Sequence, residues 1–279
     1  MRFQLDGSWR RPGDGSVVVA GSPLRLFRLS AGGAHVMAQV EAGTQSDTAA
    51  VRQLLDRFVD AGALHPLPTP GSGPFTAADV TVVVPAYATW PQPVPNVPAT
   101  QVIVVDDASP IPLHPPDSDD TPVPDDTPVP VVSGDHVMPS PAIRRLRHDT
   151  NRGPGAARNT GLAEVRTALV AFVDTDVRLT DGWLEPLLAH FSDPRVALVA
   201  PRVASDPDAP SPTARYEVRH SPLDVGDQPA RISPGTRVSY VPAAVMVCRA
   251  DVVRAVGGFD ETLSPLARLR WNVSVGGVQ

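Results

Sequence analysis

The sequence predicts an α/β protein with a mostly parallel sheet covered by helices on both faces, preceded by a small α+β unit. From residue 79 onward, apolar runs of strand length alternate with segments of helical spacing, an order typical of parallel sheets. The runs are nearly continuous in Val, Ile and Leu, which indicates strands that are buried on both faces. Residues 1–66 differ, because two short β-rich runs precede two helical segments there.

The expected strands of the larger region are apolar and rich in β-branched residues, at 79–87, 100–109, 167–176 and 195–203. Helices are expected after the second and third of these regions, at 155–166 and 181–191. A fifth strand followed by a helix fits residues 241–256. We therefore expect residues 79–263 to form one large domain.

The N-terminal region is expected to form a hairpin and two helices. The runs SVVVA (16–20) and LRLFRLS (24–30) flank the turn sequence GSP, which indicates a β-hairpin. Ser30 is placed to cap a first helix, and Ser46 or Asp47 to cap a second one with apolar residues at helical spacing. Such a unit suits either a recognition module or a packing appendage, and both interpretations stay open at this point.

Two stretches rich in proline interrupt these patterns. Residues 67–78 combine Pro, Gly and Ser without periodicity, so we expect a linker. Residues 110–141 contain the tandem hexamer DDTPVPDDTPVP, in which proline removes backbone donors and disfavours both helix and central strand. We expect an extended, acidic, Pro-rich surface insertion there rather than a metal cluster.

Composition excludes several classes of protein. A net charge of −6 lacks the basic excess of a general nucleic-acid binder, so no nucleic-acid partner is expected. Cys248 is the one cysteine, which excludes an internal disulfide. The longest apolar stretch, residues 240–248, is far shorter than the roughly 20 residues that span a bilayer, and no signal peptide is visible. We expect a cytoplasmic protein, with peripheral attachment at the inner membrane face as a further possibility.

Three of the expected strands end in residues that suggest a binding site, namely Pro85, Tyr87, Asp106, Asp107, Asp174 and Asp176. Because the carboxyl ends of parallel strands meet at one edge, where ligands of open α/β sheets bind, we expect these residues to share a site. Neighbouring carboxylates repel each other unless a cation or a donor-rich ligand offsets their charge. Mg²⁺ and Mn²⁺ prefer a few carboxylates combined with phosphate oxygens, so a nucleotide diphosphate with a divalent cation fits.

Other interpretations compete with a cation site. Two Asp residues one position apart also occur at an ordinary polar strand end. Gly153 and Gly155 have the first spacing of a dinucleotide fingerprint, with Asp174 about 20 residues later, which would indicate an NAD-dependent oxidoreductase. However, Arg158 stands at the third glycine position, and residues 142–150 are too charged for a central strand, with arginines expected on a solvated face. The G-K-[ST] sequence of a phosphate-binding loop does not occur.

Five motifs in order, TVVVPAY, VIVVDDASP, NRGPGAARNTGL, VAFVDTDV and GGFDE, resemble the signature of inverting family 2 glycosyltransferases of the GT-A fold. The resemblance covers about residues 79–263 and implies a Rossmann-like sheet that binds a nucleotide-diphosphate sugar. It implies that Asp174 and Asp176 bind the donor and a Mn²⁺ or Mg²⁺ ion, and that Asp106 or Asp107 contacts the nucleotide base. The remaining donor-binding residues that it implies are Pro85, Tyr87, Arg152, Arg158 and Asn159.

A closer resemblance is to the mycofactocin-system glycosyltransferases of actinobacteria. It rests on GSPLRLFRLSAGG near the N-terminus and on RHSPLD with PARISPGTRVSYVPAA later in the chain. The N-terminal unit is similar to PqqD-like, winged-helix-type peptide-recognition modules. The resemblance implies transfer of a hexose, glucose in particular, from a UDP- or GDP-sugar to a peptide-derived redox cofactor, with a precursor peptide as a possible partner.

The sequence departs from the family pattern after GGFDE. Family members follow this motif with a Glu-Asp pair that supplies the catalytic base, whereas residues 262–279 contain no Asp or Glu. We interpret residues 264–279 as an atypical tail and the chain as C-terminally shortened, which leaves Asp260 and Glu261 as the remaining candidates for the base. Donor and metal binding are expected to survive while turnover is weak or lost. The alternative is a non-catalytic module that binds peptide and nucleotide.

Overall fold

The computed structural model describes residues 2–91, 101–114, 143–205, 216, 218 and 220–262. The chain divides into two compact units, residues 1–69 with 204–241 and residues 70–203 with 242–279. Most of the expected acidic insertion and the whole expected tail, residues 264–279, lie outside the described residues.

The second unit is built on a six-stranded sheet in the order β7-β6-β5-β8-β10-β9. Its strands are β5 (Val80–Ala86), β6 (Gln101–Asp106), β7 (Ile143–Arg147), β8 (Leu169–Val173), β9 (Leu198–Val199) and β10 (Val245–Arg249). The first four in the spatial order are parallel, whereas β10 runs antiparallel to both β8 and β9. The predicted mostly parallel α/β sheet is therefore confirmed.

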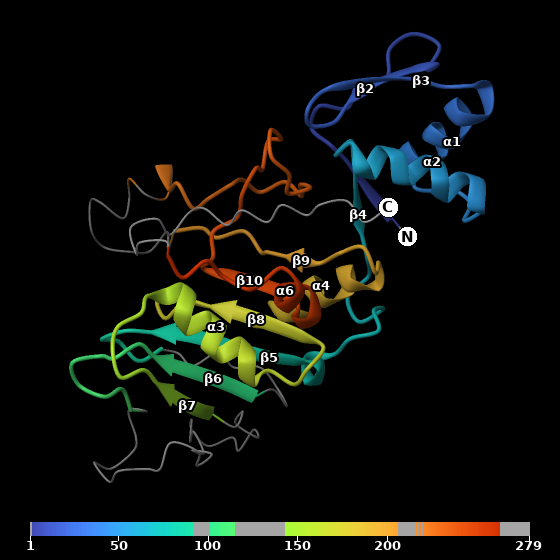
Figure 1. The fold of residues 1–279 in the computed structure, drawn as a ribbon. Helices are drawn as coiled ribbons and strands as arrows, with labels where there is room; N and C mark the ends of the chain where they lie inside the picture. Colours follow the sequence, from blue (N-terminus) through green and yellow to red (C-terminus); the bar gives the residue numbers. More distant parts are fainter. Residues whose placement is uncertain are drawn as a thin grey trace. The chain divides into compact units, whose positions relative to one another are not determined.

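Helices cover both faces of this sheet, also as predicted (Figure 1). Helices α3 (Pro154–Glu164) and α6 (Ala250–Ala255) pack on the face that carries Val83, Ile103 and Phe172. Helix α4 (Leu184–Ala189) and the 3₁₀ turn η2 (His190–Ser192) pack on the face that carries Val82, Val84 and Val104. Alternate residues of one strand therefore enter two different cores, which explains why these runs are apolar at every position.

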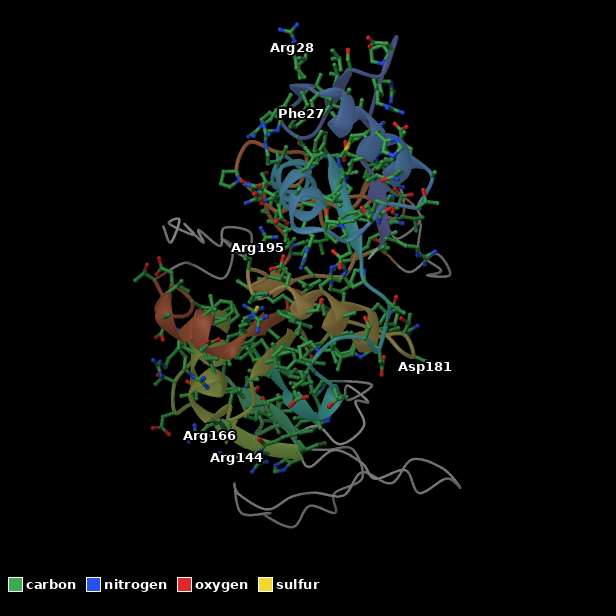
Figure 2. All side chains as sticks on the ribbon, turned by 90° about the vertical axis from the view of Figure 1, so that its right-hand side faces the viewer. Phe27, Arg28, Arg144, Arg166, Asp181 and Arg195 are labelled. Carbon is green, nitrogen blue, oxygen red and sulfur yellow. The ribbon has the colours of Figure 1, made fainter. Side chains whose placement is uncertain are left out.

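Strand β7 corrects one expectation about the basic segment 142–150. This segment was not predicted to be a strand, yet residues Ile143–Arg147 pair in parallel with β6 at the edge of the sheet. Its arginines keep partly exposed side chains and also have partners within the chain. Arg144 pairs with Glu164 at 2.6 Å, and Arg145 donates to the carbonyl of Leu113 at 3.0 Å. An edge strand tolerates charge because its side chains reach solvent and partners beyond the sheet. Figure 2 shows Arg144 and Arg166 at the periphery of the second unit.

Two further strands differ from their predicted form. The run at 195–203 contributes only Leu198–Val199 as regular strand, at the opposite edge from β7. The strand expected from residue 241 onward begins at Val245 and is antiparallel, so its amino end lies beside the carboxyl end of β8. Strand direction is set by the path of the connecting chain, which the apolar pattern of a strand does not record.

The first unit contains the predicted hairpin and both predicted helices, β2 (Val17–Ala20), β3 (Arg25–Arg28), α1 (Ala31–Glu41) and α2 (Ala49–Asp60). Ser30 caps α1 as predicted, but Thr48 caps α2 in place of Ser46 or Asp47. A second antiparallel pair, β1 (Arg2–Leu5) with β4 (Leu64–Leu67), was not predicted. Both strands are only four residues long, too short for a clear period-two pattern.

The core of this unit is centred on Phe58, which stacks on Phe27 of β3 with ring centroids 4.3 Å apart. The described part of residues 204–241 also belongs to this unit. Arg231 donates to the carbonyl of Asp60 at 2.5 Å, and the backbone N–H of Arg237 donates to the hydroxyl of Ser22 at 2.6 Å. Among the described residues, no helix is long and apolar enough to span a bilayer.

The close contact between α3 and β5 gives a first prediction. A Cβ atom added at Gly161 would lie 2.3 Å from Cγ1 of Val83, so the Gly161→Ala protein should be less stable by about 1–3 kcal/mol. Urea unfolding followed by circular dichroism measures this difference. Gly32→Ala in α1, where nothing lies within 4 Å, is the control and should not destabilise. Equal effects of the two substitutions would contradict the packing argument.

Candidate functional site

The carboxyl ends of β5, β6, β7 and β8 meet at one edge of the sheet, and the residues that follow them form the candidate site. Backbone and hydroxyl groups tie the loops together at this edge. The hydroxyl of Ser109 accepts from the N–H of Ala88 at 2.8 Å, and the N–H of Asp107 donates to the carbonyl of Ala86 at 2.9 Å. The N–H of Asp174 donates to the carbonyl of Ala244 at 2.9 Å, which brings the start of β10 to the same edge.

Asp106 is fully buried at the end of β6, and both of its oxygens are engaged within the protein. It accepts from the N–H of Ser109 at 2.9 Å and from that of Leu113 at 3.2 Å, and Arg147 forms a short ion pair with it. Burial raises the pKa of this carboxyl group, but the bonds from Ser109, Leu113 and Arg147 outweigh burial and bring the pKa below its ordinary value. Asp106 therefore anchors the loop that follows β6.

Asp107 is almost as deeply buried, at 4% exposure, and organises a different loop. One carboxylate oxygen accepts from His148 Nδ1 at 2.7 Å and from the backbone N–H of Arg152 at 2.9 Å. The other accepts from the backbone N–H of Gly153 at 2.7 Å. The start of the NRGPG sequence is thereby fixed to the end of β6. Adjacent aspartates of one motif hold separate loops.

Asp174 and Asp176 follow β8 and remain accessible to a ligand, since Asp174 is half-buried and Asp176 is exposed. Arg158 of α3 donates to Asp174 at 2.5 Å from beneath the loop. This arginine is only 7% exposed, and its guanidinium lies 5.4 Å from the ring centroid of Phe259. Its Nε is buried without a hydrogen-bond partner within the described chain. Arg158 is therefore a buried partner of Asp174.

Asn159 joins the GGFDE sequence to α3. Its side-chain amide donates to the carbonyl of Phe259 and to the carboxylate of Glu261, both at 2.9 Å, and its oxygen accepts from the N–H of Phe259 at 2.8 Å. Arg152 also donates to Glu261 at 2.9 Å. A Cβ atom at Gly258 would lie 2.5 Å from the Asn159 oxygen, so this clamp requires glycine there. Sequence reasoning did not anticipate this link between two motifs 100 residues apart.

Asp260 and Glu261, the two candidates for the catalytic base, both accept hydrogen bonds. The bonds from Asn159 and Arg152 outweigh slight burial and hold the pKa of Glu261 below its ordinary value. The bonds from Thr262 lower the pKa of Asp260 in the same way. Catalytic bases of the carboxylate type usually have a raised pKa, because proton transfer is most efficient near the working pH. This environment therefore disfavours both residues as proton acceptors at neutral pH.

Two alanines at the site edge adopt left-handed backbone conformations, Ala88 with a φ of 59° and Ala108 with a φ of 57°. Each stands in the loop after a parallel strand, β5 or β6, and the bond from Ala88 to Ser109 connects these loops. Such a conformation costs a residue with a side chain roughly 1–2 kcal/mol, and strain of this kind collects at binding sites. The residue type alone gives no signal of it, because alanine is common in unstrained segments.

Asp174 and Asp176 supply too few ligands for a divalent cation unless a bound molecule adds oxygen ligands. Within the described residues, no group of three or more His, Cys, Asp or Glu side chains could hold a metal ion. Two carboxylates, Asp174 and Asp176, are nevertheless the donor set that Mg²⁺ and Mn²⁺ use when phosphate oxygens complete their coordination. The residues present fit a cation that arrives with a diphosphate.

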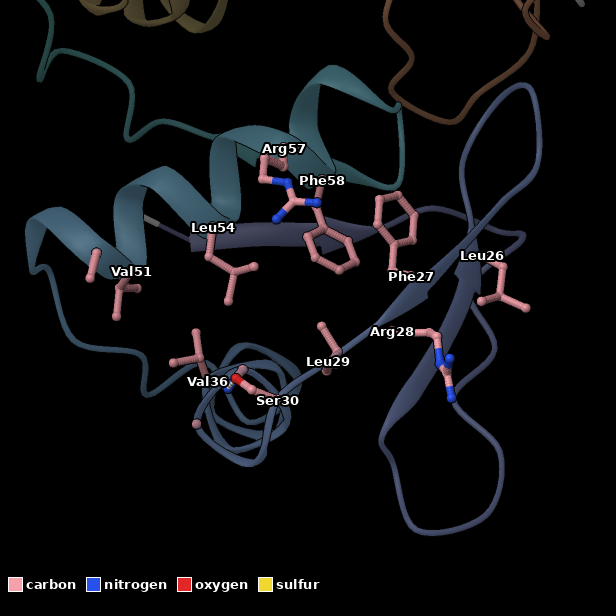
Figure 3. A pocket seen from close by; sticks show the side chains of 13 residues that line it. Leu26, Phe27, Arg28, Leu29, Ser30, Val36, Val51, Leu54, Arg57 and Phe58 are labelled. Atoms are coloured by element: carbon pink, nitrogen blue, oxygen red, sulfur yellow. Dashed lines mark hydrogen bonds between the residues drawn. The ribbon is translucent and has the colours of Figure 1, made fainter.

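A second candidate surface lies within the first unit. A groove of about 390 Å³ runs between β3, α1 and α2 and is lined mainly by apolar side chains. Figure 3 shows Phe27, Leu29, Val36, Leu54 and Phe58 around it, with Arg57 at its rim. This volume is in the range of ligand-binding pockets. Within the described chain, β3 pairs with β2 alone, so its outer edge offers free backbone groups to an extended chain.

Comparison with known proteins finds similar glycosyltransferases. The model of Glycosyl transferase family 2 matches residues 118–252. The chain is also 42% identical over 263 residues to the Pre-mycofactocin glycosyltransferase of Mycobacterium tuberculosis, strain H37Rv. Residues 118–252 therefore resemble a family 2 glycosyltransferase domain. The match covers 93% of this chain and 51% of the relative, so the chain spans about half the length of that protein.

Two solved structures also align with this chain. The mannosyltransferase PcManGT from Pyrobaculum calidifontis, in complex with GDP-Man and Mn²⁺, is 19% identical, with a TM-score of 0.42 over 75% of this chain and 53% of that one. The S. aureus TarS 1–349 structure in complex with UDP is 17% identical, with a TM-score of 0.41 over 65% of this chain and 50% of that one.

The strained alanines give a second prediction. Ala108→Gly should stabilise the second unit by about 0.5–1 kcal/mol, because glycine adopts a φ of 57° without steric cost. Ala163→Gly, at an exposed helical position of α3, is the control and should destabilise by about 1 kcal/mol. Urea unfolding measures both changes. A loss of stability in Ala108→Gly would show that the left-handed conformation carries no strain.

Proposed function

We propose that the second unit binds a nucleotide-diphosphate sugar together with a divalent cation and presents the sugar to an acceptor hydroxyl. The observation that carries this proposal is the position of Asp174 and Asp176, which follow a buried strand at the edge where parallel strands end. They are accessible to a ligand, whereas Asp106 and Asp107 are buried and accept hydrogen bonds on both oxygens. The match of residues 118–252 to the model of Glycosyl transferase family 2 supports the same assignment.

Asp174 and Asp176 are proposed to hold the cation and the sugar diphosphate. When bound, the cation supplies positive charge that stabilises the departing diphosphate as a Lewis acid. Arg158 supports this arrangement from below, because its ion pair with Asp174 fixes the direction of that carboxylate. A half-buried carboxylate that is already oriented loses less side-chain entropy when it binds the cation.

The nucleotide is proposed to lie against Tyr87 and the loop that begins at Arg152. Tyr87 is 51% exposed and offers a ring face for a base, while Pro85 is buried in β5 and shapes the strand end. Asp106 and Asp107 already accept bonds on both oxygens, so we assign them to loop support instead of direct contact with the base. Arg152 is half exposed and able to reach a phosphate, whereas Asn159 acts by fastening Phe259 and Glu261.

The acceptor is proposed to be a peptide-derived redox cofactor, and the transferred sugar a hexose such as glucose. Support for the acceptor comes from the name of the Mycobacterium tuberculosis relative, a pre-mycofactocin glycosyltransferase. We further propose that neither Asp260 nor Glu261 is the catalytic base, because hydrogen bonds hold the pKa of both carboxyl groups below its ordinary value.

Donor titration tests the first part of this proposal. Calorimetry with UDP-glucose or GDP-glucose and MnCl₂ should show binding that is lost without the metal. Asp174→Asn and Asp176→Asn should each weaken it at least about tenfold, because each removes one charged ligand of the cation. Asp251→Asn is the control, since this exposed residue follows the opposite end of β10, away from the site. Metal-independent binding would refute the cation site.

The groove of the first unit supports a second candidate function, the capture of a precursor peptide. Its apolar lining and the unpaired edge of β3 suit an extended chain with alternating apolar residues. Arg57 at its rim and Arg28 on the outer side of β3 add positive charge, and Figure 2 shows Arg28 projecting outward. A module that binds peptide without catalysis remains the alternative to a complete enzyme.

Charge removal at the groove tests this second function. Arg57→Gln should weaken binding of a fluorescein-labelled precursor peptide about threefold to tenfold, measured by fluorescence polarisation. Arg52→Gln is the matched control, because Arg52 is exposed on the same helix and does not line the groove. Equal affinities of the two variants would exclude Arg57 from the peptide site.

A further inference from the structure

His148 occupies a buried position between two motifs of the candidate donor site. It follows β7 and is 8% exposed. Its Nδ1 lies 2.7 Å from Asp107 Oδ1, and its Nε2 lies 2.8 Å from the Thr160 hydroxyl on α3. The Asp107 carboxylate can only accept, so Nδ1 carries the proton of that bond. One imidazole thus joins the end of β6 to α3.

The bond from His148 bears directly on the loop that carries Arg152. Asp107 Oδ1 accepts from both His148 and the Arg152 backbone, and Oδ2 accepts from the Gly153 backbone. Gly153 has a φ of 87°, so the chain turns sharply there before α3 begins. If the carboxylate rotated, it would lose both backbone bonds together. The conformation of the loop therefore depends on what holds the carboxylate.

We propose that His148 is a positioning residue for the donor site, acting through Asp107 on the backbone of Arg152 and Gly153. With Nδ1 on Asp107 and Nε2 on Thr160, the imidazole is anchored on α3 and keeps the carboxylate in the direction that both N–H groups require. The inference rests on the proposed function, because it assigns the loop to nucleotide-sugar binding. His148 is itself buried and is not placed to touch the donor.

The geometry of the imidazole separates this role from simple core packing. The side-chain amide of Asn reaches about as far as Nδ1 of His, whereas that of Gln reaches about as far as Nε2. His148→Asn can keep the bond to Asp107 and lose the one to Thr160. His148→Gln can keep the bond to Thr160 and lose the one to Asp107. Both variants leave a smaller, polar side chain in the same pocket, so their effects on packing should be similar.

The experiment titrates UDP and GDP into each protein with MnCl₂ present. His148→Gln should raise the dissociation constant about tenfold, and His148→Asn about twofold at most, while the melting temperatures of the two variants fall to a similar extent. Thr160→Val replaces the hydroxyl with a methyl group. Its dissociation constant should resemble that of His148→Asn. Equal affinities of His148→Asn and His148→Gln would overturn the proposal.

Hydrogen exchange of the backbone amides keeps the inference testable independently of any nucleotide. The N–H groups of Arg152 and Gly153 should exchange faster in His148→Gln than in His148→Asn. If the unaltered chain binds neither UDP nor GDP, the proposed donor site fails, but the amide comparison still decides the role of His148. Unchanged exchange in His148→Gln would overturn the positioning role even if the donor binds.

Discussion

Two adjacent carboxylates, Asp106 and Asp107, are buried where β6 ends. The rest of the site is arranged around the hydrogen-bond donors that these carboxylates need. A buried carboxylate is very unfavourable unless hydrogen bonds or opposite charges compensate for the lost water. Asp106 obtains them from the loop after β6 and from Arg147 of β7. Asp107 obtains them from His148 and from the loop before α3. These hydrogen bonds fix two separate loops, the one after β6 and the one between β7 and α3, at one edge of the sheet.

This arrangement explains why motifs far apart in the chain act as one unit. Asp107 fixes Arg152, Arg152 donates to Glu261, and Asn159 holds the backbone on which Glu261 lies. Arg158, one residue earlier on α3, lies beneath Asp174. Two consecutive residues of α3 therefore have different partners. Arg158 pairs with Asp174, and Asn159 holds the GGFDE loop. The accessible residues, Tyr87 and Asp176, lie on loops that follow strands of the same sheet.

Much of the sheet could be predicted from the sequence, because strands buried on both faces are apolar at every position. β5, β6 and β8 follow this rule, and the aspartates after them were recognised from their place at strand ends. β7 was missed because its arginines have partners at the edge of the sheet that a local pattern does not reveal. The roles of Arg158 and Asn159 were equally hidden, since their partners lie 16 and 100 residues away in the chain.

The antiparallel direction of β10 affects how this fold can vary. The chain arrives at the site edge at Ala244, crosses the sheet in β10, and comes back through α6 to the same edge at Glu261. The segment between these two points therefore begins and ends beside the proposed donor site. Both junctions of this segment therefore lie at the edge where the parallel strands end. The sequence at these two junctions can change while the parallel strands stay the same.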